Sequence, residues 1–181
     1  MTTHGEVAEI DKQFLADLRK NVRQFTEAVG QQYDGQGVRV LDVAPQVHEG
    51  AAPYFKSAQV DTLDLDPQSG ATYIADLCRT NAELIKDASY DIVVCTEVLE
   101  HTLNPFAAVA EMQRILRVGG VAAVSTPFNF RIHGPLPDCW RFTEHGLREL
   151  FKDFELVSLE QLDDPDRFLM PVHYTLVAKK K

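Results

Sequence analysis

The first thirty residues place apolar side chains at the spacing of a helix. Apolar residues recur there at steps of three and four, at Val7, Ile10, Phe14, Leu18, Val22, Phe25 and Val29. Residues at this spacing form one stripe along an α-helix. The pattern predicts an amphipathic helix over residues 7–29, within an N-terminal covering segment (1–30) that packs on one face of a sheet.

Short apolar runs rich in β-branched residues follow this helix and are typical of buried strands. Five of them are VRVLDVA (38–44), VDTLDLD (60–66), ATYIAD (71–76), YDIVVCTEV (90–98) and VAAVSTPF (121–128). Two later runs, FELVSL (154–159) and FLMPVHYTLVAK (168–179), close the chain, and Pro171 predicts an edge or a bulge in the last of them.

Two further helices are predicted between these strands. Residues 104–120 carry Asn104 as an N-cap, Pro105 at the first helical position and the pair Gly119-Gly120 as a C-terminal stop. A shorter helix is predicted over 144–151. Strands that alternate with helices favour a parallel sheet, because parallel neighbours need crossover connections, whereas the closing pair predicts an antiparallel hairpin.

Size and charge narrow the class of protein. The chain has 181 residues, of which 45% are hydrophobic and 25% charged, so we expect one globular domain over 1–181. The net charge of −9 disfavours nucleic acid and anionic membranes as partners. Three scattered cysteines without a CxxC pair argue against disulfides and a zinc knuckle. No secretory signal or apolar span is visible, and we expect a cytoplasmic protein.

Acidic residues stand at the predicted strand ends, where ligands bind in open α/β sheets. Asp42 follows the first strand, and Asp64 lies about 20 positions later, the spacing at which a carboxylate accepts hydrogen bonds from a ribose. Asp66 is the alternative, although Asp66-Pro67 is equally typical of a turn. Asp76 is placed either to accept a bond from an adenine amine or to cap a following helix.

The combined motifs resemble the class I S-adenosylmethionine-dependent methyltransferases, in particular the subgroup whose fourth strand runs into V-L-E-H. The resemblance covers residues 38–151 and rests on VRVLDVA, TLDLDP, ADL, SYDIVVCTEVLEH, ILRVGGVAAVSTP and CWRFTEHGL. It implies a doubly wound, mostly parallel seven-stranded α/β sheet with an antiparallel last strand, a Rossmann-like methyltransferase fold, and S-adenosylmethionine as cofactor.

The resemblance also implies a set of cofactor-binding residues. Asp64 would hold the ribose and Asp76 the adenine, with Leu77 beside it, while Thr96 and Glu97 would line the cofactor pocket. The family's first tip, beside Asp42, carries Gly-x-Gly-x-Gly.

In this chain the three glycine positions of that tip hold Ala44, Gln46 and His48. A side chain at each position adds bulk and disfavours positive φ. Either the loop is rebuilt around the same ligand, with Ala44 and Gln46 or His48 against it, or affinity for the cofactor is weakened or lost. We favour rebuilding because the other strand tips keep the family pattern.

The predicted catalytic residue is His101, with Glu100 and His133 as further candidates. Histidine is the side chain best suited to remove a proton near neutral pH, so His101 is expected to act as base or to orient the acceptor; otherwise it packs at a helix start. Alternatively, Glu97, Glu100 and His101 converge on one divalent cation, with His133 as a distant fourth ligand. This E-x-x-E-H pattern is similar to the metal motif of some ubiquinone-pathway and small-RNA methyltransferases.

Residues 127–142 form the predicted acceptor loop, with charged side chains at Arg131, His133 and Arg141 and aromatic ones at Trp140 and Phe142. Arginines suit phosphate or carboxylate groups and aromatics suit a flat or sugar-like face, although Trp140 and Phe142 also suit a core.

The sequence therefore predicts methyl transfer to oxygen, or less favourably nitrogen, of a small molecule or glycan. The alternative is a catalytically degenerate protein that uses the same fold for binding or assembly. A homodimer is possible, because a second subunit could cover an open site.

Overall fold

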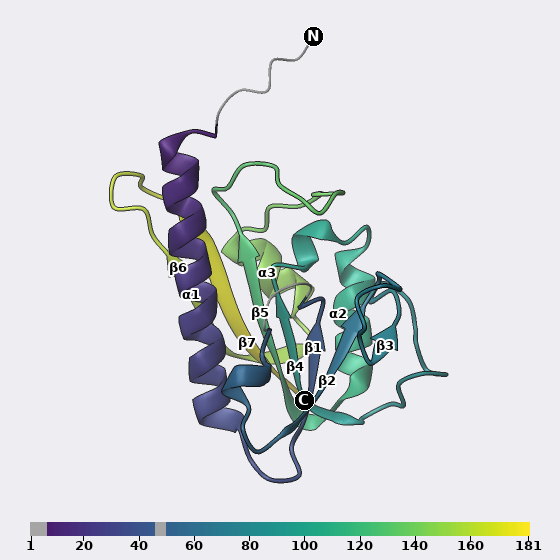
Figure 1. Ribbon diagram of the computed structural model, residues 1–181. Coiled ribbons are helices and arrows are strands. Elements are labelled where there is room, and N and C mark those ends of the chain that lie inside the picture. Colours follow the sequence, from purple (N-terminus) through teal and green to yellow (C-terminus); the bar gives the residue numbers. More distant parts are fainter. Residues whose placement is uncertain (1–6, 46–49) are drawn as a thin grey trace.

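The computed structural model describes residues 7–45 and 50–181, which form one seven-stranded sheet with strand order β3-β2-β1-β4-β5-β7-β6 (Figure 1). The strands are β1 (Arg39–Val43), β2 (Gln59–Asp64), β3 (Tyr73–Ile74), β4 (Tyr90–Thr96), β5 (Leu116–Pro127), β6 (Phe154–Leu162) and β7 (His173–Lys180). Pairs from β3 to β5 are parallel, whereas β7 is antiparallel to both β5 and β6. This confirms the predicted mixed sheet with an antiparallel last strand.

Helix α1 (Glu9–Tyr33) lies along one face of the sheet, where it contacts β5 and β7 (Figure 1). It extends four residues beyond the predicted end at Val29. Its buried side chains Phe14, Leu18 and Val29 belong to the apolar stripe seen in the sequence. Near its C-terminus, Gly30 lies against Tyr54 of the short 3-10 helix η1 (Ala52–Tyr54) so closely that a Cβ there would stand 2.4 Å from the Tyr54 carbonyl oxygen.

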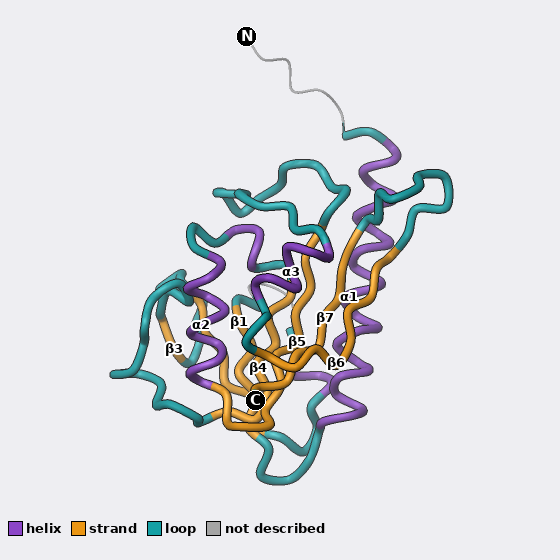
Figure 2. Tube along the Cα trace, turned by 180° about the vertical axis from the view of Figure 1, so that it is seen from behind, coloured by secondary structure: helices purple, strands orange, loops and turns teal. Residues whose placement is uncertain are grey.

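Helices α2 (Pro105–Ile115) and α3 (Glu144–Leu150) lie on the opposite face, as the view from behind shows (Figure 2). The predicted cap and first position of α2 are confirmed, because the Asn104 side chain accepts a hydrogen bond from the Ala107 amide and Pro105 begins the helix.

The predicted end of this helix at Gly119-Gly120 is wrong. Helix α2 ends at Ile115, and both glycines belong to β5. The register with β4 jumps from the pair Tyr90–Leu116 to the pair Ile92–Val121, so the extra residues of β5 form a bulge in which Gly119 has a φ of +80°. Glycine favours such a bulge for the same reason that it favours a helix end, its tolerance of positive φ.

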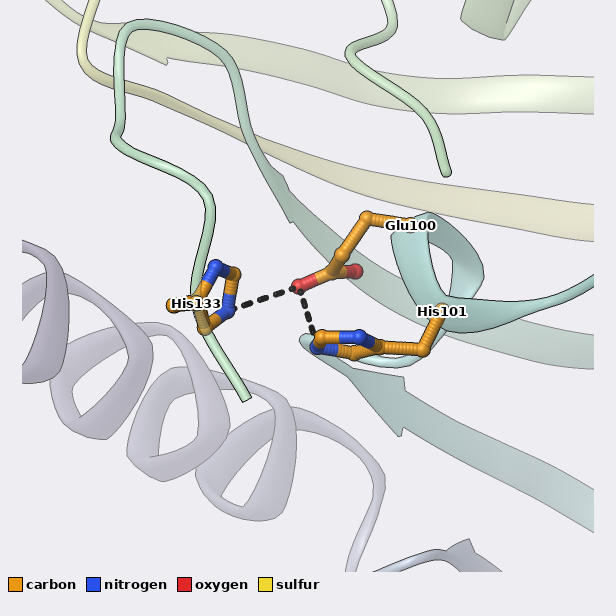
Figure 3. Close-up of side chains that lie close together, drawn as sticks. All are labelled: Glu100, His101 and His133. Carbon is orange, nitrogen blue, oxygen red and sulfur yellow. Dashed lines mark ion pairs between the residues drawn. The ribbon is translucent and has the colours of Figure 1, made fainter. Parts of the chain in front are cut away.

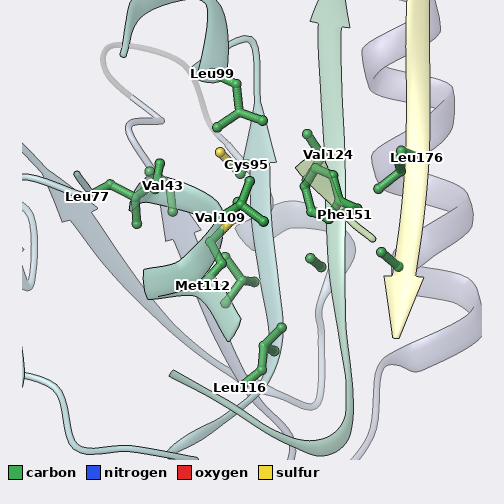
Figure 4. Close-up of a cluster of buried hydrophobic side chains, with 14 of the residues drawn as sticks. Val43, Leu77, Cys95, Leu99, Val109, Met112, Leu116, Val124, Phe151 and Leu176 are labelled. Atoms are coloured by element: carbon green, nitrogen blue, oxygen red, sulfur yellow. The ribbon is translucent and has the colours of Figure 1, made fainter. Parts of the chain in front are cut away.

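The described residues of the β1–β2, β2–β3 and β3–β4 connections form no α-helix, although the first of them contains η1. The β1–β2 connection contributes Ala51 and Phe55 to an apolar cluster under α1, together with Val40 and Val94. On the other face the β3–β4 connection contributes Leu77 and Ile85 to the larger cluster beneath α2 and α3, part of which is drawn in Figure 4. Both faces of the sheet are thus covered, and ligand access is left at the strand ends.

None of the helices in the described part of the chain is long and apolar enough to cross a membrane.

Candidate functional site

A cavity of about 450 Å³ lies at the carboxyl ends of β1 and β4, bounded on one side by α1. The strand tips contribute Asp42, Ala44, Thr96 and Glu97, and His101 follows them in the η2 turn (Leu99–His101). Helix α1 contributes six residues, namely Leu15, Leu18, Arg19, Val22, Arg23 and Thr26. His133, from the predicted acceptor loop, completes the wall. The structure therefore brings together six predicted site residues: Asp42, Ala44, Thr96, Glu97, His101 and His133.

Asp42 anchors the loop after β1. Its Oδ2 accepts a hydrogen bond from the Ala51 amide at 2.7 Å, and burial raises its pKa to about 6 despite this bond. Gly50 lies directly against this carboxylate: a Cβ there would stand 2.2 Å from Oδ2. A side chain larger than that of glycine would not fit here without a shift of Asp42.

Ala44 has a φ of +51°, in the left-handed region that favours glycine. A non-glycine residue in this region is strained by roughly 1 kcal/mol. Rebuilding of the first loop around the cofactor stays a prediction. Gln46 and His48 lie outside the described residues.

Glu97 also has a left-handed backbone, with a φ of +56° directly after β4. Its Oε1 accepts hydrogen bonds from Ser125 Oγ at 2.8 Å and from His173 Nε2 at 2.6 Å. His173, which begins β7, escaped the sequence analysis because nothing in its local pattern distinguishes it from a strand residue. One oxygen of Glu97 is therefore held by residues of β5 and β7.

Three side chains converge beside the cavity: Glu100, His101 and His133 (Figure 3). Glu100 Oε1 lies 3.7 Å from His101 Nε2 and 3.8 Å from His133 Nε2. The two imidazole rings meet edge to face with centroids 4.9 Å apart. One ligand atom from each residue can be chosen such that all three lie within 4.8 Å of one another. Glu97, predicted to share a cation with Glu100 and His101, is not part of this group, and His133 takes its place.

The burial of Glu100 is unusual for a carboxylate. Its side chain is 0% exposed, and neither Oε atom accepts a hydrogen bond from any residue that the structure describes. Burial, reinforced by the negative charge of Glu97, raises the pKa of Glu100 well above its ordinary value. A buried carboxylate without a partner needs a proton or a cation, because isolated buried charges are strongly disfavoured.

His101 is oriented from behind by an acceptor at Nδ1, which lies 2.9 Å from the Pro137 carbonyl oxygen. Metal-binding histidines are oriented by acceptors in this way. His133 Nδ1 lies 3.1 Å from Asp138 Oδ2 but makes no hydrogen bond with any described residue, whereas the His133 backbone amide donates to the same oxygen. Asp138 is itself paired with Arg141, which holds the pKa of Asp138 well below its usual range. Burial lowers the pKa of His133, which favours the neutral imidazole that a metal binds.

The chemistry of this donor set fits a divalent cation, since one carboxylate and two neutral imidazoles are a common ligand set for transition metals. The orphaned oxygens of Glu100 are the observation that carries this fit.

The predicted adenosine ligands lie elsewhere. Asp64 and Asp76 end β2 and follow β3, but neither lines the cavity, nor does Leu77, which is buried in the core. Asp64 Oδ1 accepts a hydrogen bond from the Asp66 amide, and Asp76 Oδ1 accepts one from the Cys78 amide. No α-helix lies between β3 and β4, so the alternative in which Asp76 caps a following helix is wrong, and this residue makes a turn. Contact of Asp64 and Asp76 with adenosine stays a prediction.

The predicted acceptor loop divides into structural and exposed parts. Phe142 is buried in the core, whereas Trp140 is 41% exposed and donates its Nε1 hydrogen to the Thr102 carbonyl. Arg141 is engaged by Asp138. Of the charged residues proposed there, Arg131 lies exposed and His133 faces the cavity.

This strand order, with its antiparallel last strand and a cavity over the tips of β1 and β4, defines the class I S-adenosylmethionine-dependent methyltransferase fold. A family model described as a methyltransferase domain matches residues 21–124, more than half of the chain, and the chain belongs to that family.

Solved structures with this fold include the [4+2]-cyclase SpnF, with a TM-score of 0.69 at 16% identity over 87% of this chain and 80% of that one. Another is the 1,6-didemethyltoxoflavin-N1-methyltransferase of Burkholderia thailandensis, with a TM-score of 0.64 at 17% identity over 99% of this chain and 93% of that one.

The ubiquinone biosynthesis O-methyltransferase of Rickettsia akari is similar in sequence, with 30% identity over 83 residues, which are 42% of this chain and 33% of that protein. The Rickettsia prowazekii enzyme of the same name is 29% identical over 92 residues, or 51% of this chain and 36% of the enzyme. The chain thus spans about a third of the length of the curated relatives it matches.

Proposed function

We propose that this protein transfers the methyl group of S-adenosylmethionine to an oxygen atom of a small molecule or glycan. The observation that carries the proposal is the cavity at the tips of β1 and β4, with Glu100, His101 and His133 converging at its side. The likeness to O-methyltransferases of ubiquinone biosynthesis supports oxygen over nitrogen as the acceptor atom.

The charges around the cavity suit the methionine portion of the cofactor, which carries one ammonium and one carboxylate. Arg19 and Arg23, one turn apart on α1, offer positive charge from one wall. Asp42 and Glu97 offer carboxylates from the strand tips. A wall with both signs of charge complements a zwitterion, and arginine is well suited to a carboxylate.

Methyl transfer is an in-line displacement on the sulfonium carbon, so alignment of the acceptor provides most of the acceleration. The acceptor oxygen forms a bond to the methyl carbon as the carbon–sulfur bond breaks, the electron pair returns to sulfur, and the hydroxyl proton must leave. Because His101 Nδ1 donates its hydrogen to the Pro137 carbonyl, Nε2 carries the lone pair, and His101 lines the cavity, so this nitrogen is the candidate to accept that proton.

We further propose that Glu100, His101 and His133 hold a divalent cation, which would lower the pKa of an acceptor hydroxyl bound to it. In that case His101 Nε2 is a ligand, and the residues of the cluster position the acceptor beside the methyl group. The two roles of His101 exclude each other, because one lone pair cannot bind both a cation and a proton.

Calorimetric titration with S-adenosylmethionine and S-adenosylhomocysteine tests the cofactor assignment. We expect saturable binding of both. Transfer of tritiated methyl groups to a panel of phenols, sugars and amines then tests the acceptor class, and we expect labelled phenols or sugars. Absence of binding would leave the degenerate binding protein as the better assignment, and labelled amines alone would make nitrogen the acceptor.

Metal titration separates the two roles of His101. After chelation we expect Mg²⁺, Mn²⁺, Co²⁺ or Zn²⁺ to bind the wild-type protein and to restore methyl transfer. We expect His133→Ala to lose both the metal binding and the restored activity. His145→Ala, which removes an exposed imidazole on α3, is the matched control and should behave as wild type. If the wild-type protein keeps full activity after chelation and His101→Ala loses about 10²-fold or more of that activity, His101 is instead the base.

A further inference from the structure

Glu97 is held in one orientation by two hydrogen bonds to the same oxygen. Ser125 Oγ and His173 Nε2 both donate to Oε1, at 2.8 and 2.6 Å. Oε2 accepts no hydrogen bond from the part of the chain that the structure describes, yet Glu97 lines the cavity with its side chain 21% exposed. The free oxygen is therefore available to a ligand, and as a carboxylate oxygen it can only accept.

His173 is fixed in its turn by α1. Its side chain is 0% exposed, and its Nδ1 lies 2.9 Å from the amide nitrogen of Asn21. An amide nitrogen can only donate, so Nδ1 is the acceptor and Nε2 carries the hydrogen that Glu97 receives. The chain of bonds from Asn21 through His173 to Glu97 joins α1, which forms one wall of the cavity, to the strand tip opposite.

Glu97 and Glu100, which lies three residues further along the chain, thus have different surroundings. Glu100 faces His101 and His133 without any hydrogen-bond partner among the described residues, whereas Glu97 faces the cavity at the tips of β1 and β4. The strained φ of +56° at Glu97 produces this divergence, because the backbone turns left-handed at that residue and then enters the 3-10 turn.

We infer that His173 is a positioning residue that directs the Glu97 carboxylate at the ammonium group of the methionine portion of the cofactor. The inference rests on the proposed function, since it takes S-adenosylmethionine as the ligand. Glu97 accepts hydrogen bonds from the ammonium through Oε2, while Ser125 and His173 hold Oε1. His173 itself is buried and does not contact the ligand.

The test compares two ligands that differ at this group. S-adenosylhomocysteine carries the ammonium, whereas 5′-methylthioadenosine keeps the nucleoside and thioether and lacks the whole amino-acid portion. Calorimetry on His173→Leu should show S-adenosylhomocysteine bound about 10-fold more weakly and 5′-methylthioadenosine bound as in wild type. His173→Gln should restore most of the affinity, because the glutamine side-chain amide can donate to Oε1 in place of the imidazole. Equal weakening of both ligands, or no rescue by glutamine, would reduce His173 to a structural residue.

A double-mutant cycle with Glu97→Gln provides a second and independent measure. If His173 acts through Glu97, the double variant Glu97→Gln/His173→Leu should bind S-adenosylhomocysteine no more weakly than Glu97→Gln alone. Additive losses would overturn the inference. His145→Leu is the matched control at an exposed imidazole, and circular dichroism on each unliganded variant establishes its folded fraction.

Failure of this inference is distinguishable from failure of the proposed function. A wild-type protein that binds neither nucleoside ligand contradicts the methyltransferase assignment itself. A wild-type protein that binds S-adenosylhomocysteine with the same affinity as His173→Leu contradicts only the role of His173.

Discussion

Replacing Glu100 by Gln should stabilise the metal-free protein at neutral pH. The Glu100 carboxyl group is fully buried without a hydrogen-bond partner among described residues, and burial raises its pKa well above the ordinary value of 4.5. Above pH 4.5 the unfolded chain releases this proton while the folded protein retains it. The folded state then binds more protons than the unfolded state, so the free energy of unfolding falls as pH rises, until the folded pKa is reached.

The size of the effect follows from that difference in protonation. Each pH unit within this window removes up to about 1.4 kcal/mol from the free energy of unfolding. For a chain of this length, 1 kcal/mol corresponds to roughly 2–4 °C in Tm. Glu100→Gln removes the titrating group and keeps its shape, so its Tm advantage over wild type should grow by about 3–6 °C per pH unit above pH 4.5.

Thermal unfolding followed by circular dichroism from pH 5 to 8, with excess chelator, measures this difference. Glu111→Gln is the matched control, because Glu111 is also buried but is paired with Arg114, which lowers its pKa although burial alone would raise it. The free energy of unfolding of Glu111→Gln should be about 2 kcal/mol lower than that of wild type at neutral pH. Addition of a divalent cation should stabilise wild type more than Glu100→Gln, so that wild type then has the higher Tm of the two. A Tm difference that is independent of pH, or a less stable Glu100→Gln at pH 8 in chelator, would refute the reasoning.

Three further substitutions test the close contacts around the first loop and α1. Asp42→Asn should stabilise the unliganded protein by up to about 3 kcal/mol at pH 7 and by little at pH 4, because the pKa of Asp42 is raised from 3.8 to about 6. Urea unfolding at both pH values measures this difference. Ala44→Gly should raise the free energy of unfolding by up to about 1 kcal/mol in the same assay, because glycine tolerates the φ of +51° without strain. A loss of stability would contradict the strain assigned to Ala44. Gly30→Ala should destabilise by about 1–3 kcal/mol, since its Cβ would stand 2.4 Å from the Tyr54 carbonyl oxygen; an unchanged urea midpoint would show that α1 and η1 separate freely.

Local patterns in the sequence were sufficient for most of the fold. The spacing of apolar residues located α1, the β-branched runs located the strands, and Asn104-Pro105 located the start of α2. These features depend on neighbours within a few positions, such as one helical turn or one cap. The end of α2 was missed because a glycine pair suits a helix stop and a strand bulge equally, and only the pairing of β5 with β4 selects the bulge.

The sequence also determined which segments carry the candidate chemistry, since Asp42, Thr96, Glu97 and His101 all line one cavity at the predicted strand ends. What it could not determine is which side chains face one another there. Glu97 is paired with His173, 76 positions away, and Glu100 meets His133 across the fold.

Such partners are chosen by the order of strands in the sheet, by a single left-handed residue after β4 and by the packing of α1 over the tips. Each of these is a long-range property, because the strand order and the contacts of α1 join residues far apart in the chain. The spacing of residues within one segment contains no information about them. The sequence thus determined the elements and their chemistry, and the tertiary structure decided their pairing.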